Sequence, residues 1–139
     1  MERTLFIIKP DAVAKRVTDK ILQRVTDAGF RLCALKSERL TTETAGNFYH
    51  VHRGKPFYES LVEFMSSGPI LVAVLEKEEA IKGLREVVGA TDPQEAQEGT
   101  IRKDFAESKG RNAVHASDSP ESAREEIAFF FPAIEFCCD

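Results

Sequence analysis

The sequence contains no tryptophan, only three cysteines and no long apolar run. Its longest apolar stretches, Leu5 to Ile8 and Ile70 to Leu75, are far shorter than the roughly 20 residues that cross a membrane. The first residues lead directly into a strand-like segment without a signal-peptide pattern. These absences argue against a membrane or secreted protein, so we expect a soluble, cytoplasmic one that does not bind membranes.

The three cysteines are too few and too irregular for a structural framework. Cys33, Cys137 and Cys138 form an odd set without C-x-x-C spacing. Such a set predicts neither a disulfide framework nor a zinc knuckle. We expect the terminal pair to lie in an exposed tail, with a bridge between subunits as the alternative.

The chain also has fewer basic than acidic residues. The chain has 19 lysine and arginine residues against 23 aspartate and glutamate residues, a formal net charge of -4. General nucleic-acid binders need basic surface against the phosphates, so we expect no nucleic-acid partner. Any anionic ligand must meet a local basic pocket.

The length of 139 residues, 42% of them hydrophobic, suits a single domain over residues 1–139.

The glycine-rich motifs that bind nucleotide phosphates are missing. Neither G-x-G-x-x-G nor G-x-x-x-x-G-K-[ST] occurs, and Gly54 and Lys55 are followed by Pro56. A nucleotide site would therefore have to use side chains. The candidates are Lys9 at a strand end, Arg85 in a helical segment, Thr91 just after it, and Arg102 in a long loop. Taken singly, each is more typical of a solvated surface residue.

Hydrophobic patterning predicts alternating strands and helices. Strands are expected at 4–9, 30–40 and 69–76, with a short one ending at His115; helices are expected at 19–28, 41–49, around 61–65, 77–88 and 120–131, and no long element at 90–111. This order fits a ferredoxin-like α+β sandwich, a four-stranded antiparallel sheet covered by helices on one face. A doubly wound parallel sheet is the alternative, but it usually has a glycine-rich turn after its first strand, and residues 9–13 contain no glycine.

The segment Gly110 to Asp118 places one histidine, His115, at the end of a short apolar run. Ser119-Pro120-Glu121 then supplies an N-cap, a proline for the first helical position and an early acid, so a helix should begin there. A histidine between strand and helix can act as a base, a metal ligand or a nucleophile, and these residues alone leave the three open. His50 and His52 are a weak metal candidate, because residues two apart on a helix point in different directions.

Several motifs in order identify the chain as similar to the nucleoside diphosphate kinase family. They are ERTL at 2–5, KPDAV at 9–13, FY at 48–49 with His52, KPF at 55–57, VEFMSSGP at 62–69, GAT at 89–91, GTIR at 99–102 and RNAVH at 111–115. The resemblance covers a core of about residues 3–131 and leaves a short tail, 132–139.

The resemblance implies a reaction and the residues nearest to it. The γ-phosphate of a nucleoside triphosphate, typically ATP, would pass to a nucleoside diphosphate in a ping-pong mechanism through a phosphohistidine on His115. Glu126 would orient the imidazole ring, Ser117 would be the hydroxyl beside it, and Tyr49 would reach toward the transferred group. Without the resemblance, Glu126 reads as a buried helix-start acid and Ser117 as a local turn residue. The implied role in the cell is maintenance of nucleoside triphosphate and deoxynucleoside triphosphate pools.

The resemblance also implies how the nucleotide is bound. The base would stack on Phe57 with Leu61 beneath, the sugar hydroxyls would meet Lys9 and Asn112, and the phosphates would meet His52, Arg85, Thr91 and Arg102. An aromatic face holds any base without reading its edge, so broad base specificity is expected. By spacing alone, Phe57 would be a core residue. Mg²⁺ is expected to be held mainly by phosphates and water, and the chain is expected to form a homo-oligomer, a tetramer or a hexamer.

Three positions depart from the usual family pattern. Ala116 replaces a glycine and requires either a negative φ or some strain. Asp92 replaces an asparagine, where its charge could weaken phosphate binding or help to hold Mg²⁺ through water, and Asp19 replaces a glycine. We expect activity to survive all three. The alternative functions are a nucleotide-binding or interaction module without turnover and a nucleic-acid-binding regulator on the same sandwich.

Overall fold

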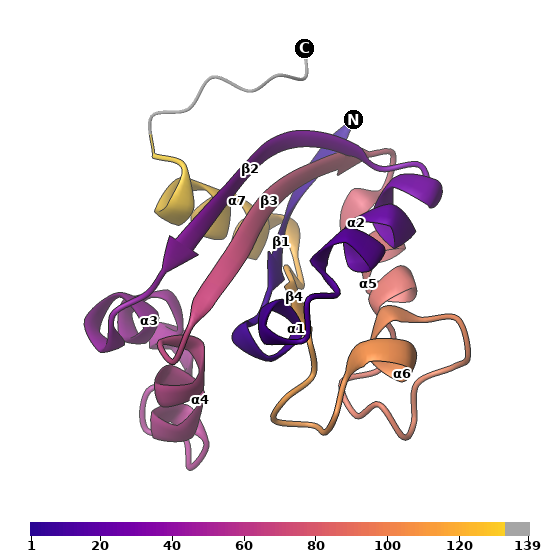
Figure 1. Cartoon of the computed structure of the whole chain (residues 1–139). Coiled ribbons are helices and arrows are strands. Elements are labelled where there is room, and N and C mark those ends of the chain that lie inside the picture. Colours follow the sequence, from indigo (N-terminus) through magenta and orange to yellow (C-terminus); the bar gives the residue numbers. More distant parts are fainter. Residues whose placement is uncertain (133–139) are drawn as a thin grey trace.

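A computed structural model describes residues 1–132, so the tail from 133 on, with Cys137 and Cys138, lies outside the described part. The elements in chain order are β1 (Glu2–Ile8), α1 (Pro10–Ala14), α2 (Thr18–Asp27), β2 (Arg31–Arg39), α3 (Thr42–Phe48), the 3₁₀ helix η1 (His50–His52), α4 (Tyr58–Met65), β3 (Pro69–Lys77), α5 (Ala80–Val88), α6 (Ile101–Phe105), β4 (Val114–Ala116) and α7 (Pro120–Phe130) (Figure 1). Among the described residues, no helix is both long and apolar enough to span a membrane.

The four strands form one antiparallel sheet in the order β2-β3-β1-β4. This is the arrangement of a ferredoxin-like α+β sandwich, so the predicted fold class is confirmed and the doubly wound parallel alternative is wrong. The register places Ile7 of β1 opposite both Val72 of β3 and His115 of β4. The histidine is therefore held by pairing to a central strand whose side chains are buried.

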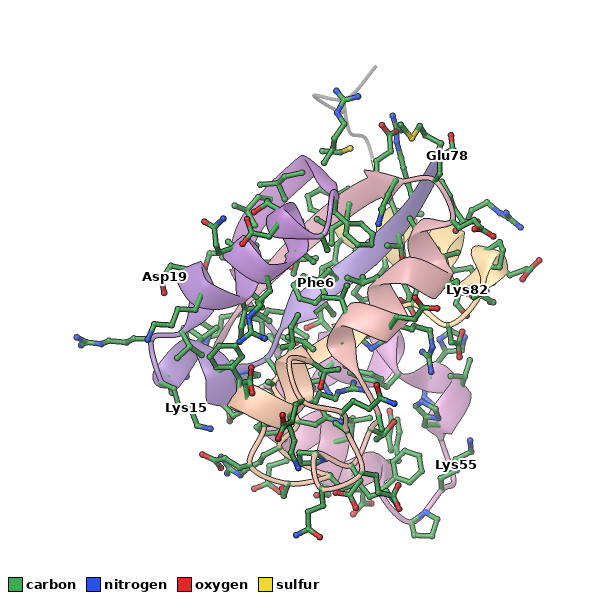
Figure 2. The ribbon with its side chains drawn as sticks, turned by 90° about the vertical axis from the view of Figure 1, so that its right-hand side faces the viewer. Phe6, Lys15, Asp19, Lys55, Glu78 and Lys82 are labelled. Carbon is green, nitrogen blue, oxygen red and sulfur yellow. The ribbon has the colours of Figure 1, made fainter. Side chains whose placement is uncertain are left out.

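Helices cover both faces of the sheet, which corrects the expectation of a single covered face. Phe6 and Ile8 pack with residues of α2 and α5 on one face. Leu5 and Ile7 pack with residues of α3, α4 and α7 on the other. Each buried side chain of this size contributes about 1.5–3 kcal/mol to stability. Figure 2 shows Phe6 inside the molecule, whereas the labelled charged side chains point outward.

Local signals explain where several helices begin. The Ser119 side chain accepts a hydrogen bond from the Ser122 backbone N–H, and Pro120 occupies the first turn of α7, as the sequence predicts. In α3, Thr41 and Thr44 form a reciprocal capping box. The two five-residue helices α1 and α6 were not predicted, because they are too short to show a helical period.

Cys33 of β2 is buried in the second core cluster. The predictions for Cys137 and Cys138 fall outside the described residues.

Candidate active site

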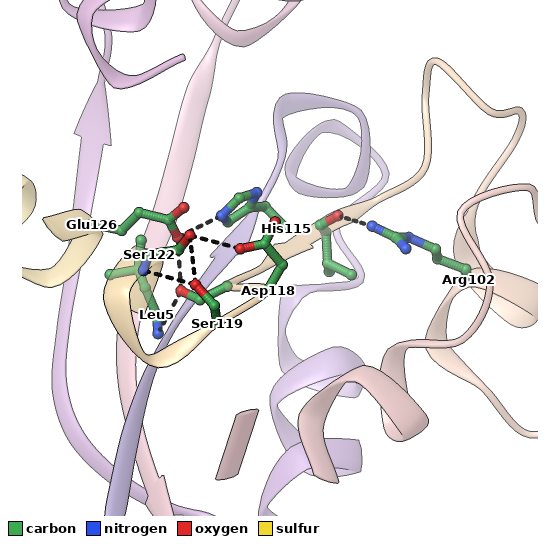
Figure 3. A network of polar contacts seen from close by, with 9 residues as sticks. Leu5, Arg102, His115, Asp118, Ser119, Ser122 and Glu126 are labelled. Atoms are coloured by element: carbon green, nitrogen blue, oxygen red, sulfur yellow. Dashed lines mark hydrogen bonds and ion pairs between the residues drawn. The ribbon is translucent and has the colours of Figure 1, made fainter. Parts of the chain in front are cut away.

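His115 is fixed by a hydrogen-bonded carboxylate. Its Nε2 lies 2.8 Å from Oε1 of Glu126, which α7 carries across from β4 (Figure 3). The Ser117 hydroxyl donates to the same oxygen at 2.7 Å and accepts the Leu5 backbone N–H at 3.3 Å. A carboxylate that accepts from Nε2 keeps the proton on that nitrogen. Among the hydrogen bonds of the described residues none involves Nδ1, so the second ring nitrogen keeps its lone pair for chemistry.

Two aromatic rings pack against the histidine at right angles. The ring centroids of Phe48 and Tyr49 lie 5.5 Å and 6.1 Å from that of His115. The hydroxyl of Tyr49 is buried and has no hydrogen-bond partner among the described residues. Burial, followed by the charge of Glu126, raises the pKa of this phenol, so it stays protonated and can donate. The hydroxyl can therefore donate a hydrogen bond to a ligand bound beside His115.

A cavity of about 760 Å³ opens over His115. The predicted site residues that line it are Lys9, Tyr49, His52, Phe57, Leu61, Arg85, Thr91, Arg102, Asn112, His115 and Glu126. Ser117 does not line the cavity; its hydroxyl instead donates to the Glu126 carboxylate. Strands, helices and loops far apart in the sequence therefore bring the predicted residues to one place, while their roles stay predictions.

One part of the cavity is apolar and aromatic. Phe57, just before α4, is 48% exposed, so its interpretation as a core residue is wrong. Leu61 and Phe64 of α4 line the cavity with it. The ring of His52 lies 5.2 Å from that of Phe57. An exposed aromatic face above aliphatic surface suits a flat, apolar ring system.

Cations gather in another part of the cavity. The ammonium of Lys9 donates to Asn112 Oδ1 at 2.9 Å. Burial, and then the charge of Arg102, lowers the pKa of Lys9 to about 8, although Asp11 acts in the opposite direction. Burial and Arg85 lower the pKa of Arg102 to about 10, so both groups are protonated at neutral pH.

Arg102 is held by backbone carbonyl groups. It donates to Asn112 through Nε at 3.4 Å, to Gly89 at 3.2 Å and to Val114 at 2.9 Å. Figure 3 shows the guanidinium on the β4 side opposite the Glu126 network. A guanidinium carries five N–H donors, so two remain for a ligand. Arg102 thus positions the strand of His115 and still offers donors to an anion.

Asp118 lines the cavity and was not predicted. Its Oδ1 accepts the Ser122 hydroxyl at 2.6 Å, and this hydrogen bond is the largest cause that lowers the pKa of Asp118. Its position three residues after His115, at the entrance to α7, was the available signal. His52 has a lowered pKa, because of its burial and then the charge of Lys55.

The three departures from the family pattern are accommodated. Ala116 lies in β4 and is not among the described non-glycine residues with positive φ, so it is unstrained. The strained alanine is instead Ala113, whose φ is 73°. Asp92 Oδ1 accepts the Gln94 backbone N–H at 3.0 Å, and Asp19 sits in the exposed first turn of α2.

His50 and His52 lie in η1, where Nδ1 of His50 is 3.0 Å from the Asn47 carbonyl. Over residues 1–132, no group of three or more histidine, cysteine or acidic residues is placed to hold a metal ion.

Comparison with known proteins gives matches over nearly the whole chain. A family model described as nucleoside diphosphate kinase matches residues 2–136. The chain is 56% identical to a nucleoside diphosphate kinase of Chlorobium limicola, over 97% of this chain and 96% of that protein. A crystal structure of the Aquifex aeolicus nucleoside diphosphate kinase superposes with a TM-score of 0.94 at 55% identity, covering 97% of this chain and 98% of that one. A halophilic nucleoside diphosphate kinase from Halobacterium salinarum, solved in complex with CDP, gives 0.92 at 37% identity, over 97% and 90% of the two chains.

Proposed function

The chain belongs to the nucleoside diphosphate kinase family of phosphotransferases, and from that premise we propose that its reaction runs through a phosphohistidine on His115. The observation that carries this is the hydrogen bond from Nε2 to Glu126, which leaves Nδ1 in the cavity as a nucleophile. In the first half-reaction, Nδ1 attacks the γ-phosphorus of a nucleoside triphosphate. The N–P bond forms, the bond to the β-phosphate oxygen breaks, and the diphosphate leaves.

The second half-reaction reverses the first with another diphosphate. Its terminal oxygen attacks the phosphohistidine, the N–P bond breaks, and His115 regains its lone pair. The ring becomes more positive whenever Nδ1 is bound to phosphorus, and the Glu126 carboxylate offsets that charge through Nε2. The Tyr49 hydroxyl would donate to the transferred group, because it is buried, protonated and without a partner among the described residues.

The nucleoside would occupy the aromatic part of the cavity. Phe57 and Leu61 would contact the faces of the base, which gives affinity without selecting a base by its edge. The complex of the Halobacterium salinarum relative with CDP is consistent with a cytidine nucleotide as one substrate. Lys9 and Asn112, which are already paired, would meet the sugar hydroxyls. Broad specificity would allow one enzyme to maintain several nucleotide pools.

The phosphates would meet the cations. Arg85, Arg102, Thr91 and His52 line the same cavity as His115. In phosphoryl transfer, such groups act mainly by positioning and by offsetting charge. Mg²⁺ would enter with the nucleotide and be held by phosphate oxygens and water. Asp118 fits a hydrated cation, because its carboxylate is ionised and lines the cavity.

We further propose that the chain works in the cytoplasm as a homo-oligomer, a tetramer or a hexamer. β2 is an edge strand of the sheet, and its Leu32 and Leu35 are 38% and 43% exposed. Edge strands with apolar side chains readily pair with a second copy. Light scattering after size exclusion would give the subunit number, and Leu35→Lys should reduce it.

Labelling tests the mechanism directly. The purified protein is incubated with γ-labelled ATP and Mg²⁺, treated with acid or alkali, and then given unlabelled GDP, with His115→Ala in parallel. We expect acid-labile, alkali-stable label on the wild type only, which moves to GTP. Tight nucleotide binding without label would support a module that has lost turnover. Binding of single-stranded DNA at physiological salt, without label, would support the nucleic-acid regulator.

A further inference from the structure

Ala113 lies two residues before His115 in a backbone conformation that favours glycine. Its φ is 73°, and it is fully buried. A non-glycine residue rarely adopts this left-handed conformation, because its Cβ approaches the backbone too closely. Something outside the residue must therefore hold it there.

Both backbone groups of Ala113 are bound by the start of α1. The Ala113 N–H donates to Oδ2 of Asp11 at 3.1 Å. The Ala113 carbonyl accepts the Lys9 backbone N–H at 2.8 Å. The turn at Ala113 is also closed by the Val114 N–H, which donates to the Asn112 carbonyl at 2.9 Å. Asp11 is the side chain that fixes the amide of the strained residue.

The same segment carries groups that face the cavity. Asn112, just before Ala113, accepts the Lys9 ammonium, and Arg102 donates to the carbonyls of Asn112 and Val114 on either side. A rotation of the backbone at Ala113 would therefore move the Asn112 side chain and the start of β4. Because β4 contains only residues 114–116, His115 would move with it.

Burial of Asp11 is costly for a purely structural residue. It is 5% exposed, and its Oδ1 has no hydrogen-bond partner among the described residues. A buried carboxylate with few hydrogen bonds destabilises a fold, whereas an apolar side chain of similar size would not. An apolar side chain could not accept the Ala113 N–H, however.

We propose that Asp11 is a positioning residue, whose carboxylate holds Ala113 in its left-handed conformation and thereby places Asn112 and His115 for phosphoryl transfer. This inference rests on the proposed function. Asp11 acts through the backbone and does not touch the reacting atoms.

Four variants test the proposal: Asp11→Ala, Asp11→Asn, Ala113→Gly and the double variant Asp11→Ala with Ala113→Gly. Rapid-quench single turnovers give the rate of His115 phosphorylation, and ¹H–¹⁵N correlation spectra of the imidazole report the placement of the ring without turnover. Asp27→Ala is the matched control, because Asp27 is an exposed aspartate of α2. Thermal melts accompany each variant.

We expect Asp11→Ala to lower the phosphorylation rate about a hundredfold, since misplacement of a reacting group by about 1 Å has that effect. Asp11→Asn should stay within about threefold of the wild type, because the amide oxygen still accepts the Ala113 N–H. Glycine adopts positive φ without strain, so Ala113→Gly should restore at least about tenfold in the Asp11→Ala background. The His115 ring signals should move in Asp11→Ala and return in the double variant.

The proposal is overturned if Asp11→Ala turns over at the wild-type rate, or if neither Asp11→Asn nor the added Ala113→Gly substitution recovers the lost rate. A loss that follows the melting temperature, with unmoved His115 signals, would also overturn it by assigning Asp11 to stability alone. A wild type that is never phosphorylated would refute the proposed function instead, and the ring signals would still decide whether Asp11 positions His115.

Discussion

Glu126→Gln isolates the charge of the carboxylate from its position. Glutamine has nearly the same shape, and its amide oxygen can still accept the bonds from Nε2 of His115 and from the Ser117 hydroxyl. The tautomer and the orientation of the ring should therefore persist. What is lost is the negative charge next to a ring that becomes positive in the transition state.

The magnitude follows from which bonds change during the reaction. The bond from Ser117 is the same in the ground state and in the transition state, so its weakening does not alter the barrier. The bond from His115 gains charge in the transition state, and a hydrogen bond to a charged group is about 1–1.5 kcal/mol stronger than a neutral one. Both side chains are about four-fifths buried, with 19% and 20% exposed, so solvent screens this difference only in part. A loss of about 1.4 kcal/mol corresponds to a tenfold lower rate.

Rapid-quench measurement of His115 phosphorylation by labelled ATP, followed by chase with GDP, gives the two half-reactions separately. We expect Glu126→Gln to slow both about tenfold with little change in nucleotide affinity. Glu126→Ala should slow them about a hundredfold or more, because it also releases the ring tautomer. Ser117→Ala is the control for the carboxylate's other bond and should cost less than Glu126→Gln. Equal rates for the Gln and Ala variants, or a Gln variant as fast as the wild type, would refute the reasoning.

Three further predictions concern separate parts of the molecule. The pKa of Lys9 is about 8, so nucleotide binding should weaken as pH rises through that value and Lys9 loses its positive charge and one of its three N–H donors. Lys9→Arg should abolish this alkaline limb in a KM–pH profile. Phe57→Ala should raise KM about tenfold for ATP and CTP alike in steady-state assays, because stacking is worth about 1–3 kcal/mol for any base. Gly89→Ala should lower the free energy of unfolding in urea by about 2–4 kcal/mol, because its φ is 90° and a Cβ would meet Thr100 Oγ1 at 2.6 Å. Gly54→Ala, with φ 85° and no atom within 4 Å, should lose only the backbone part of that energy.

The parts of the fold that were predicted have strong local signals. The helix α7 has a serine cap, an initial proline and an early acid, and its first residue was predicted correctly. The coverage of the sheet was predicted wrongly, although the unbroken run Leu5 to Ile8 already indicated a strand buried on both faces. α1 and α6 are too short to show a helical period, and each is also bonded to a distant segment, as Asp11 of α1 is to Ala113 and Arg102 of α6 is to Gly89. Such contacts leave no period in the sequence.

The family resemblance named residues that the structure gathers around one cavity, but it could not give their hydrogen bonds. The sequence does not show that Arg102 donates three hydrogen bonds to backbone carbonyls. It also does not show that the Tyr49 hydroxyl has no hydrogen-bond partner among the described residues. Nor does it say which ring nitrogen of His115 meets Glu126. These hydrogen bonds depend on how α6, α3 and α7 pack around β4, because a change of a few tenths of an ångström between donor and acceptor makes or breaks a bond.

Backbone strain was expected at the wrong alanine. The pattern of relatives pointed to Ala116, after the histidine, whereas the positive φ lies at Ala113, before it. Alanine by itself prefers negative φ, so no local preference could have indicated Ala113. The conformation is held by two bonds from the start of α1, one of them from a buried carboxylate, together with the Val114 N–H that donates to the Asn112 carbonyl at 2.9 Å. Where the backbone preference of a residue and its tertiary hydrogen bonds disagree, the strained conformation persists because the surrounding packing or the function of the site requires it. Here the segment concerned also carries Asn112 and leads into His115, so under the proposed mechanism the strain is part of how His115 is placed.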